Sequence, residues 1–296
     1  MAQRTGGDIY LGLVGPVRTG KSTFIRRFME TLVIPNIEDV YAKERAKDEL
    51  PQSGSGRTIM TAEPKFVPED AVNVTLEGGV TFSVRMVDCV GYMVDGASGQ
   101  FEDGTERMVA TPWFDEEVSM SRAAEEGTRR VIAEHSTIGI VMTTDGTICG
   151  IPREGYVPAE ERVVSELKAI GKPFVLVLNS AEPYSDAAQA LRSELADKYG
   201  VTCVCVNCLD LTAEDIDEIL KFALYEFPIA ELGIYLPSWL DALPSDAPLK
   251  SGILEAIAEA VQDMSRVRDA FGIMDALGGR EDVSAAGIRN VDMGTG

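Results

Sequence analysis

The stretch "GPVRTGKSTFIRRF", from Gly15 to Phe28, decides the fold class of this chain. Its first eight residues fit the pattern G-x-x-x-x-G-K-[S/T] without a gap. The apolar run Ile9–Val14 precedes them as a strand would, and apolar residues at helical spacing follow from Ser22 to Met29. A glycine-rich turn between a strand and a helix is typical of phosphate-binding loops, so the stretch predicts a nucleotide site; the alternative is a chance match on a strand–helix turn.

The residue types of this loop suit a phosphate ligand. Inward-turned backbone amides and the helix N-terminus attract the β-phosphate. We expect Lys21 to reach the β- and γ-phosphates and Ser22 to ligate Mg²⁺. The loop residues expected to contact the nucleotide are Gly15, Val17, Arg18, Thr19, Gly20, Lys21, Ser22 and Thr23.

Composition excludes several classes of partner. The 296 residues are 45% hydrophobic and carry a net charge of −21, which argues against non-specific nucleic-acid binding and against adhesion to anionic lipid. No signal peptide and no apolar stretch long enough to span a bilayer stands out, so we expect no direct membrane insertion. The five cysteines show neither a disulfide framework nor a convincing zinc pattern, which favours buried thiols in a reducing cytosol: Cys89, Cys149, Cys203, Cys205 and Cys208.

Strand-like and helical patterns alternate along most of the chain. Strand-like runs are Thr137–Asp145, Lys172–Ser180 and Val201–Asn207, and helical patterns are Asp115–Glu134, Pro158–Ile170, Ser185–Tyr199 and Thr212–Phe227. The stretch "AVNVTLEGGVTFSVRMVDCVGY" indicates a hairpin with its turn at Gly78-Gly79. These patterns predict an α/β fold of the GTPase-like (TRAFAC) P-loop NTPase type, with a mostly parallel central sheet, one antiparallel edge strand, and helices on both faces.

The residue pattern of the sequence changes after Pro228. A proline-containing stretch follows, and Ile253–Asp275 then shows long helical periodicity. We therefore expect a nucleotide-binding domain in residues 1–228. Residues 229–296 are expected to be the partial, largely helical start of a second region.

A second motif completes the expected phosphate site. "RMVDCVGY" places Asp88 and Gly91 in a D-x-x-G pattern at a strand end. The carboxylate of Asp88 can hold Mg²⁺, usually through a water, and Gly91 leaves a backbone amide free to approach the γ-phosphate. A P-loop switch protein also places a threonine from a mobile loop on the metal. Thr58 and Thr61 are the candidates for that role.

Two departures from regulatory GTPases bear on activity. Tyr92 stands where many of them carry a water-orienting glutamine, so another group must place the attacking water. Where they carry N-K-x-D for guanine, this chain reads Asn179-Ser180-Ala181-Glu182. We expect Asn179 and Ser180 to contact the base. Guanine specificity is weakly supported, although Glu182 leaves it possible.

Three other charged or titratable residues have simpler interpretations. His135, the single histidine, lies at a helix–strand junction and is interpreted as structural. Arg129 and Arg130 could lend positive charge to a γ-phosphate, or they could form a solvated helix face.

With these residues assembled, the chain resembles the family of stage IV sporulation protein A, the spore-coat morphogenetic ATPases of endospore-forming Firmicutes. The resemblance covers residues 4 to about 240 in one colinear series. The matching stretches are "RTGGDIYLGLVGPVRTGKSTFIRRFME", "DELPQSGSGRTIMTAEPKFVP", "VRMVDCVGY", "TPWFDEE", "EHSTIGIVMTTDGTI", "GKPFVLVLNS", "ALYEFP" and "LPSWL".

This resemblance implies a GTPase-like fold that hydrolyses ATP with Mg²⁺ as it assembles into a static polymer. The polymer would form the spore-coat basement in the cytoplasm, on the mother-cell side of the forespore. The implied partners are further copies of the chain, a small amphipathic peptide that senses membrane curvature, and other coat proteins. The membrane-associated C-terminal part of the family has no counterpart here, so we expect a truncated chain.

The resemblance also assigns roles to residues. Lys21 is the catalytic P-loop lysine, Asp88 the magnesium-linked aspartate, and Thr61 the γ-phosphate sensor, which makes Ser22, Thr61 and Asp88 the expected metal ligands. The family has a second sensor threonine next to the first, but this chain has Ala62 there. Asn179-Ser180 agrees with the degraded base motif of the family. A regulatory GTPase and a non-hydrolysing scaffold that merely keeps a nucleotide are the alternative functions.

Overall fold

The computed structural model describes residues 8–51, 63–75, 81–97, 101–102, 105–262, 264–280 and 282–291. The chain divides into two compact units, of which the first ends at Ala223 and the second begins at Leu224. None of the helices within these described ranges combines the length and the apolar character needed to cross a bilayer.

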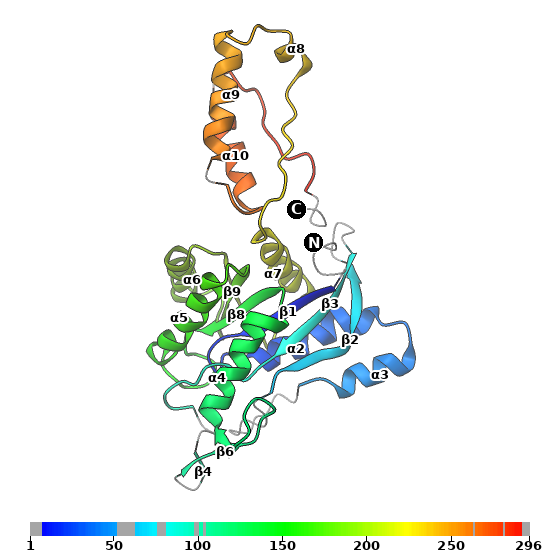
Figure 1. Ribbon diagram of the computed structural model, residues 1–296, viewed down its shortest axis with the longest axis vertical. Coiled ribbons are helices and arrows are strands. Elements are labelled where there is room, and N and C mark those ends of the chain that lie inside the picture. Colours follow the sequence, from blue (N-terminus) through cyan, green and yellow to red (C-terminus); the bar gives the residue numbers. More distant parts are fainter. Residues whose placement is uncertain are drawn as a thin grey trace. The chain divides into compact units, whose positions relative to one another are not determined.

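A six-stranded sheet forms the centre of the first unit (Figure 1). Its strand order is β10-β9-β8-β1-β3-β2. Neighbouring strands run parallel except β2 and β3, which pair antiparallel at one edge and confirm the predicted fold class. The turn predicted at Gly78-Gly79 lies outside the described residues. The strands are β1 (Asp8–Val14), β2 (Lys65–Thr75), β3 (Thr81–Asp88), β8 (Ile138–Thr144), β9 (Phe174–Asn179) and β10 (Cys203–Val206).

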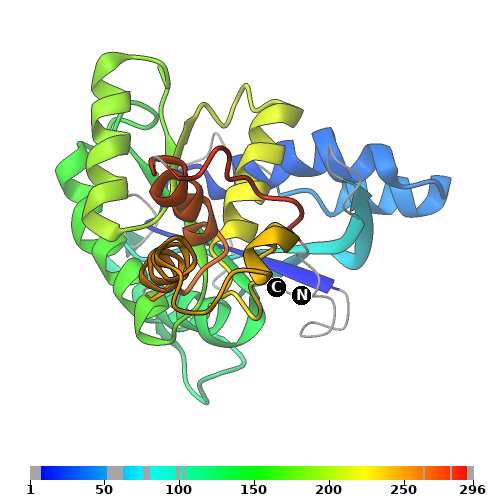
Figure 2. The same ribbon diagram turned by 90° about the horizontal axis from the view of Figure 1, so that it is seen from above.

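Helices cover both faces of this sheet. In Figure 2, α2 (blue) and α7 (yellow) lie on one side of β1, and α5 (green) lies on the other. Apolar side chains of α5 and α6, among them Val163 and Leu195, join Val141 and Leu176 of the strands in one buried cluster. The helices are α2 (Lys21–Phe28), α3 (Val40–Asp48), α4 (Met120–Arg130), α5 (Arg153–Ala169), α6 (Asp186–Tyr199) and α7 (Ala213–Tyr225). Single turns at Met29–Val33, Ile34–Asn36 and Val131–His135 extend α2 and α4.

Local sequence signals set most of these boundaries. Ser185 caps α6, since its Oγ accepts from the amide of Ala188 over 3.3 Å. Thr212 and Asp215 bond reciprocally at the start of α7. The helix predicted from Pro158 instead begins at Arg153, because the fully buried Tyr156 anchors the extra turn. Two short hairpins pair β4 (Phe101–Glu102) with β5 (Thr105–Glu106) and β6 (Met108–Val109) with β7 (Val118–Ser119).

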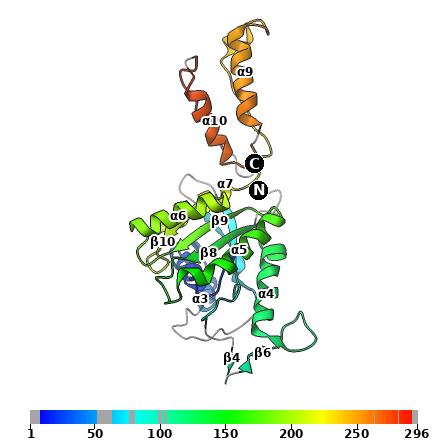
Figure 3. The ribbon, with the colours of Figure 1, turned by 90° about the vertical axis from the view of Figure 1, so that its left-hand side faces the viewer.

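Three helices lie in the described part of the second unit. It contains α8 (Ser238–Asp241), α9 (Pro248–Val261) and α10 (Asp269–Gly278), the last two visible as separate helices in Figure 3. The helical periodicity over Ile253–Asp275 therefore falls on two helices, α9 and α10.

Polar contacts explain the break between α9 and α10. The Asp269 carboxylate accepts from the backbone amides of Ser265 and Arg266 over 3.0 and 2.8 Å, which starts a new helix. The buried carboxylate of Glu226 also binds the guanidinium groups of Arg266 and Arg268. These bonds satisfy polar groups of the connection between the two helices.

Candidate nucleotide-binding site

The phosphate loop follows β1 and leads into α2, as predicted. Gly15 and Gly20 have φ angles of 137° and 94°, which side-chain-bearing residues rarely adopt. A Cβ atom on Gly15 would lie 2.2 Å from the carbonyl oxygen of Met142. One on Gly20 would lie 2.3 Å from Nδ2 of Asn179. The path of the loop therefore requires glycine at both positions.

Lys21 lies inside the loop and is 5% exposed. Its Nζ donates to the carbonyl oxygens of Pro16 and Gly15 over 2.6 and 3.4 Å. Burial lowers the pKa of Lys21, while the neighbouring Cys89 and Asp88 act in the opposite direction. Thr19 Oγ1 also donates to Pro16, over 2.9 Å. The ammonium group is thus held among loop carbonyls, at the place where the motif predicts phosphate.

Ser22 and Asp88 come together at the first turn of α2. Ser22 Oγ donates to Asp88 Oδ2 over 3.1 Å. Asp88 Oδ1 is buried and has no hydrogen-bond partner within the described part of the chain. Burial raises the pKa of Asp88, and Lys21 and the bond from Ser22 oppose that rise. A hydroxyl beside a carboxylate with an unsatisfied oxygen is a donor set that suits Mg²⁺.

The described residues alone do not form a complete metal site here. Among the residues that the structure describes, no group of three His, Cys, Asp or Glu side chains could hold a metal ion. A magnesium ion at Ser22 and Asp88 would therefore need phosphate or water oxygens as well. Thr58 and Thr61 lie outside the described residues, so the assignment of Thr61 as a ligand and sensor stays a prediction.

The D-x-x-G segment crosses directly over the phosphate loop. Gly91 has a φ of 93°, and a Cβ atom there would lie 2.2 Å from Gly15 O and 2.5 Å from Lys21 Nζ. The amide of Tyr92 donates to Gly15 O over 3.2 Å, and Val17 N donates to Tyr92 O over 2.9 Å. Gly91 is thereby placed next to Lys21, and the approach of its amide to a γ-phosphate stays a prediction.

The Tyr92 side chain points away from the phosphate loop. It is 2% exposed, its hydroxyl donates to Glu166 Oε2 of α5 over 2.5 Å, and the Arg162 guanidinium lies 4.1 Å from its ring centroid. A side chain anchored in this way is not free to orient a water at the phosphates. Because Tyr92 is held by Glu166, another group must place the attacking water, as the sequence indicated.

The expected base motif is tied to the phosphate loop. Asn179 Nδ2 donates to Thr19 O, and Asn179 Oδ1 accepts from the amide of Cys208, both over 3.1 Å. Ser180 is fully buried, and its Oγ accepts from the amide of Glu182, whose side chain is exposed. Asn179 thus braces two loops, and a contact of Asn179 or Ser180 with the base stays a prediction.

Sequence reasoning missed Asp145 and Thr147 beside this motif. Thr147 Oγ1 donates to Asp145 Oδ1 over 2.6 Å and accepts from the amide of Ala181 over 2.9 Å. Burial alone would raise the pKa of Asp145, but hydrogen bonds from Ser180 and Thr147 outweigh it and hold the pKa below its usual range. The available signal was a polar Thr-Thr-Asp at the carboxyl end of a buried strand.

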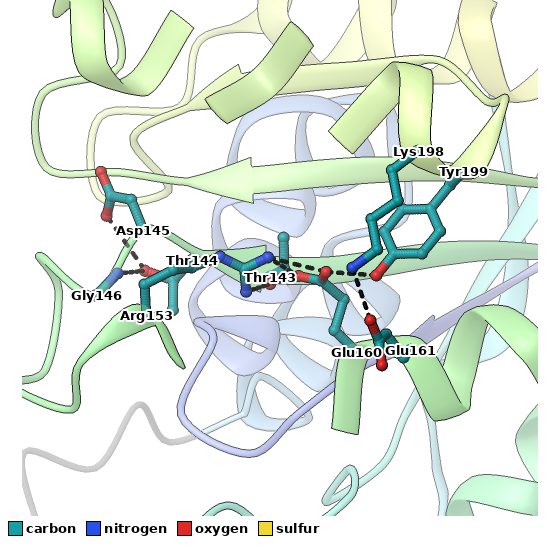
Figure 4. A network of polar contacts seen from close by, with 9 residues as sticks. All are labelled: Thr143, Thr144, Asp145, Gly146, Arg153, Glu160, Glu161, Lys198 and Tyr199. Atoms are coloured by element: carbon teal, nitrogen blue, oxygen red, sulfur yellow. Dashed lines mark hydrogen bonds and ion pairs between the residues drawn. The ribbon is translucent and has the colours of Figure 1, made fainter. Parts of the chain in front are cut away.

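Figure 4 shows Asp145 at the end of β8, together with a buried network behind that strand. The side chain of Glu160 is fully buried. It accepts from Thr143 Oγ1 over 2.5 Å and from the Tyr199 hydroxyl over 2.7 Å, and it pairs with Arg153 over 2.7 Å. This network fastens β8, α5 and α6 behind the loop that carries Asp145.

The arginine pair and the single histidine contact residues outside the phosphate loop. Arg129 and Arg130 both pair with Glu126 along α4. These ion pairs agree with the interpretation of the two arginines as part of a solvated helix face. The His135 ring packs edge-on against Phe66, with centroids 5.9 Å apart. Of the five free thiols only Cys149 is exposed. Burial raises the pKa values of Cys89 and Cys205 to about 11 and that of Cys203 to about 12.

The strand order, the phosphate loop and the D-x-x-G crossing define a P-loop NTPase of the GTPase-like type. Residues 1–228 match the family model "Stage IV sporulation protein A, ATPase domain", and residues 229–296 match "Stage IV sporulation protein A, middle domain". The chain therefore belongs to the stage IV sporulation protein A family.

Three curated relatives carry the name stage IV sporulation protein A. The chain is 50% identical to the relative from Clostridioides difficile (strain 630), 48% to that from Bacillus anthracis and 47% to that from Bacillus subtilis (strain 168). Each match covers all 296 residues of this chain and 60% of the relative. The chain thus spans about three fifths of the length of these proteins.

Proposed function

We propose that this chain binds ATP together with Mg²⁺ and hydrolyses it to ADP and phosphate. The observation that carries this proposal is the contact between Ser22 and Asp88, with Asp88 Oδ1 left without a partner among the described residues. A buried oxygen of this kind is normally satisfied. A magnesium ion at the head of the phosphate loop would satisfy it.

Each residue of the site has a role in this proposal. Lys21 exchanges its bonds to loop carbonyls for bonds to phosphate oxygens, which offer it a stronger, charged acceptor. Ser22 and Asp88 hold the metal, which when bound neutralises charge on the phosphates. The amides of the loop bind the β-phosphate. Thr61 senses the γ-phosphate.

Preference for ATP follows from the altered base motif. Guanine presents two donors that the aspartate of N-K-x-D accepts, but this chain has an exposed Glu182 at that position and Ser180 in place of the lysine. Amide and hydroxyl groups can both donate and accept, which suits the mixed edge of adenine. A regulatory GTPase is the alternative. Direct competition decides between them, since GTP that displaces ATP at equal concentration contradicts the ATP assignment.

We further propose that the nucleotide cycle drives assembly of the chain into a spore-coat basement layer on the mother-cell side of the forespore. Family membership supports this proposal, and the net charge of −21 argues against a nucleic acid as the partner. The partners would be further copies of the chain, a small amphipathic curvature-sensing peptide, and other coat proteins. Sedimentation with ATP, with ADP and without nucleotide tests the self-association.

Substitutions at the site test hydrolysis. Lys21→Ala should weaken ATP binding and abolish multiple-turnover phosphate release, whereas Asp88→Ala should spare binding more than turnover. Lys198→Ala is the matched control, because Lys198 is an exposed lysine whose ion pair with Glu161 lies at the surface. Thr61→Ala should slow hydrolysis and leave ADP affinity nearly intact. Unchanged turnover in Lys21→Ala excludes this site, and absence of turnover in the unmodified chain supports the scaffold alternative.

A further inference from the structure

Arg18 has an unusual backbone for its residue type. It lies within the phosphate loop with a φ of 64°. All the other residues with a positive φ in the described ranges are glycines. The left-handed region brings Cβ close to the neighbouring backbone, so glycine adopts it at lower cost than arginine does. A glycine at this position would follow the same path without that strain.

Hydrogen bonds on three successive residues hold the loop in this conformation. Val17 N donates to Tyr92 O over 2.9 Å, and Thr19 O accepts from Asn179 Nδ2 over 3.1 Å. The carbonyl of Arg18 itself lies 3.7 Å from the donor Cys149 Sγ. These contacts hold the backbone on both sides of Arg18. Strain that the surroundings maintain in this way is characteristic of functional positions.

Arginine adds a permanent positive charge where an anionic ligand is expected. ATP brings several negative charges into a chain whose net charge is −21. The Lys21 ammonium is buried among loop carbonyls, and Arg129 and Arg130 are paired with Glu126 on α4. Arg18 is only half-buried and lies on the loop itself. Its planar guanidinium can bind two phosphate oxygens at once.

We propose that Arg18 is a second phosphate-binding cation of this site and a catalytic residue. Its guanidinium binds oxygens of the triphosphate and stabilises the charge that develops on them during hydrolysis. This inference rests on the proposed ATP hydrolysis and adds to it a specific residue outside the lysine and the metal ligands.

The hydrolysis step shows where such a cation acts. The water oxygen forms a bond to the γ-phosphorus, and the bond from that phosphorus to the β–γ bridging oxygen breaks. The electron pair of the broken bond stays on ADP. One water proton remains on the product phosphate and the other passes to solvent. Negative charge therefore grows on the oxygen that leaves with ADP, so a cation bound beside it stabilises the transition state more than the ground state.

Three substitutions separate charge from strain. Arg18→Gly and Arg18→Asn remove the charge and relieve the strained backbone, since both residues accept the left-handed conformation. Arg18→Lys keeps the charge and the strain. Arg129→Gln is the matched control, because it removes an exposed arginine of the same unit. The measurements are thermal unfolding without nucleotide, affinity for a non-hydrolysable ATP analogue and for ADP, and the rate of phosphate release.

We expect Arg18→Gly and Arg18→Asn to unfold at a higher temperature than the unmodified chain. Both should bind the triphosphate analogue at least about tenfold more weakly, with a smaller change for ADP. Phosphate release should fall by more than binding does, on the order of a thousandfold, the lower end of the effect of arginines in phosphoryl transfer. Arg18→Lys should unfold like the unmodified chain and keep part of the activity, and Arg129→Gln should behave normally.

The opposite pattern overturns the proposal. If Arg18→Gly and Arg18→Asn gain stability yet bind and hydrolyse ATP like the unmodified chain, Arg18 is not a phosphate-binding cation. If the unmodified chain releases no phosphate, the proposed function fails by itself. In that case equal triphosphate affinity of the Arg18→Asn variant and the unmodified chain rejects the binding role of Arg18 as well.

Discussion

The side-chain amide of Asn179 donates to the carbonyl oxygen of Thr19 over 3.1 Å, so the end of β9 is fastened to the phosphate loop. The same side chain accepts from Cys208 N and is 4% exposed. We therefore expect Asn179→Ala to lower the free energy of unfolding by about 1–3 kcal/mol, because buried groups lose their partners.

The effect of Asn179→Ala on nucleotides distinguishes two roles. As a brace, Asn179 should support ATP and GTP binding equally, so both affinities should fall together. As a reader of the base, it should change their ratio. Competition binding with both nucleotides measures this. Gln189→Ala serves as a control, because the Gln189 side chain donates to Pro183 O, outside the phosphate loop.

Tyr92→Phe should leave the hydrolysis rate nearly unchanged. Its hydroxyl bonds to Glu166 and not to any group of the phosphate loop, so its loss should lower stability by about 1 kcal/mol without touching the reacting atoms. Tyr199→Phe, which removes a comparable bond to Glu160, is the matched variant. A large drop in turnover for Tyr92→Phe alone would assign the residue a part in placing water.

Thiol reactivity should separate Cys149 from the other cysteines. At pH 8 a thiol with a pKa of about 11, such as Cys89 or Cys205, is ionised in roughly one molecule per thousand, against about a quarter for an unperturbed thiol. Only the exposed Cys149 should react quickly with a thiol reagent. Peptide mapping after brief labelling checks this, and fast labelling of Cys89 contradicts it.

The same shifts predict a loss of stability in alkaline solution. Between the unfolded pKa of about 8.5 and the folded value of about 11, the folded chain retains thiol protons that the unfolded chain releases. The free energy of unfolding should therefore fall as pH rises through this window. Cys205→Ser should reduce the slope, measured as the change in denaturant midpoint between pH 8 and pH 10.

Glu226→Ala should destabilise the second unit selectively. The Glu226 carboxylate is fully buried and pairs with Arg266 and Arg268, so its removal leaves both cations without that charge. The expected loss is about 3 kcal/mol or more, as for other broken buried ion pairs. Limited proteolysis should cut after residue 228 while ATP still binds. Arg280→Ala, which breaks an ion pair with Asp282 on the surface, should have little effect.

Local sequence determined much of this protein. The spacing from Gly15 to Ser22, the apolar runs and the D-x-x-G at Asp88 predicted the parallel sheet, the antiparallel edge and the position of the phosphate site. Those features depend on residues close together in the chain: glycines where the backbone must turn left-handed, and continuous apolar runs where a strand is buried on both faces.

Only the tertiary structure decided how distant segments share the site. Asn179 bonds to Thr19 across 160 positions, and Thr147 Oγ1 accepts from the amide of Ala181. The bonds of Asp269 and Glu226 lie at the connection between α9 and α10. Tyr92 occupies a position that suggests catalysis, yet it points into α5 because Glu166 offers its hydroxyl a partner. Hydrogen bonds between segments far apart in sequence leave no periodic signal, since they depend on which strand ends meet at one edge of the sheet.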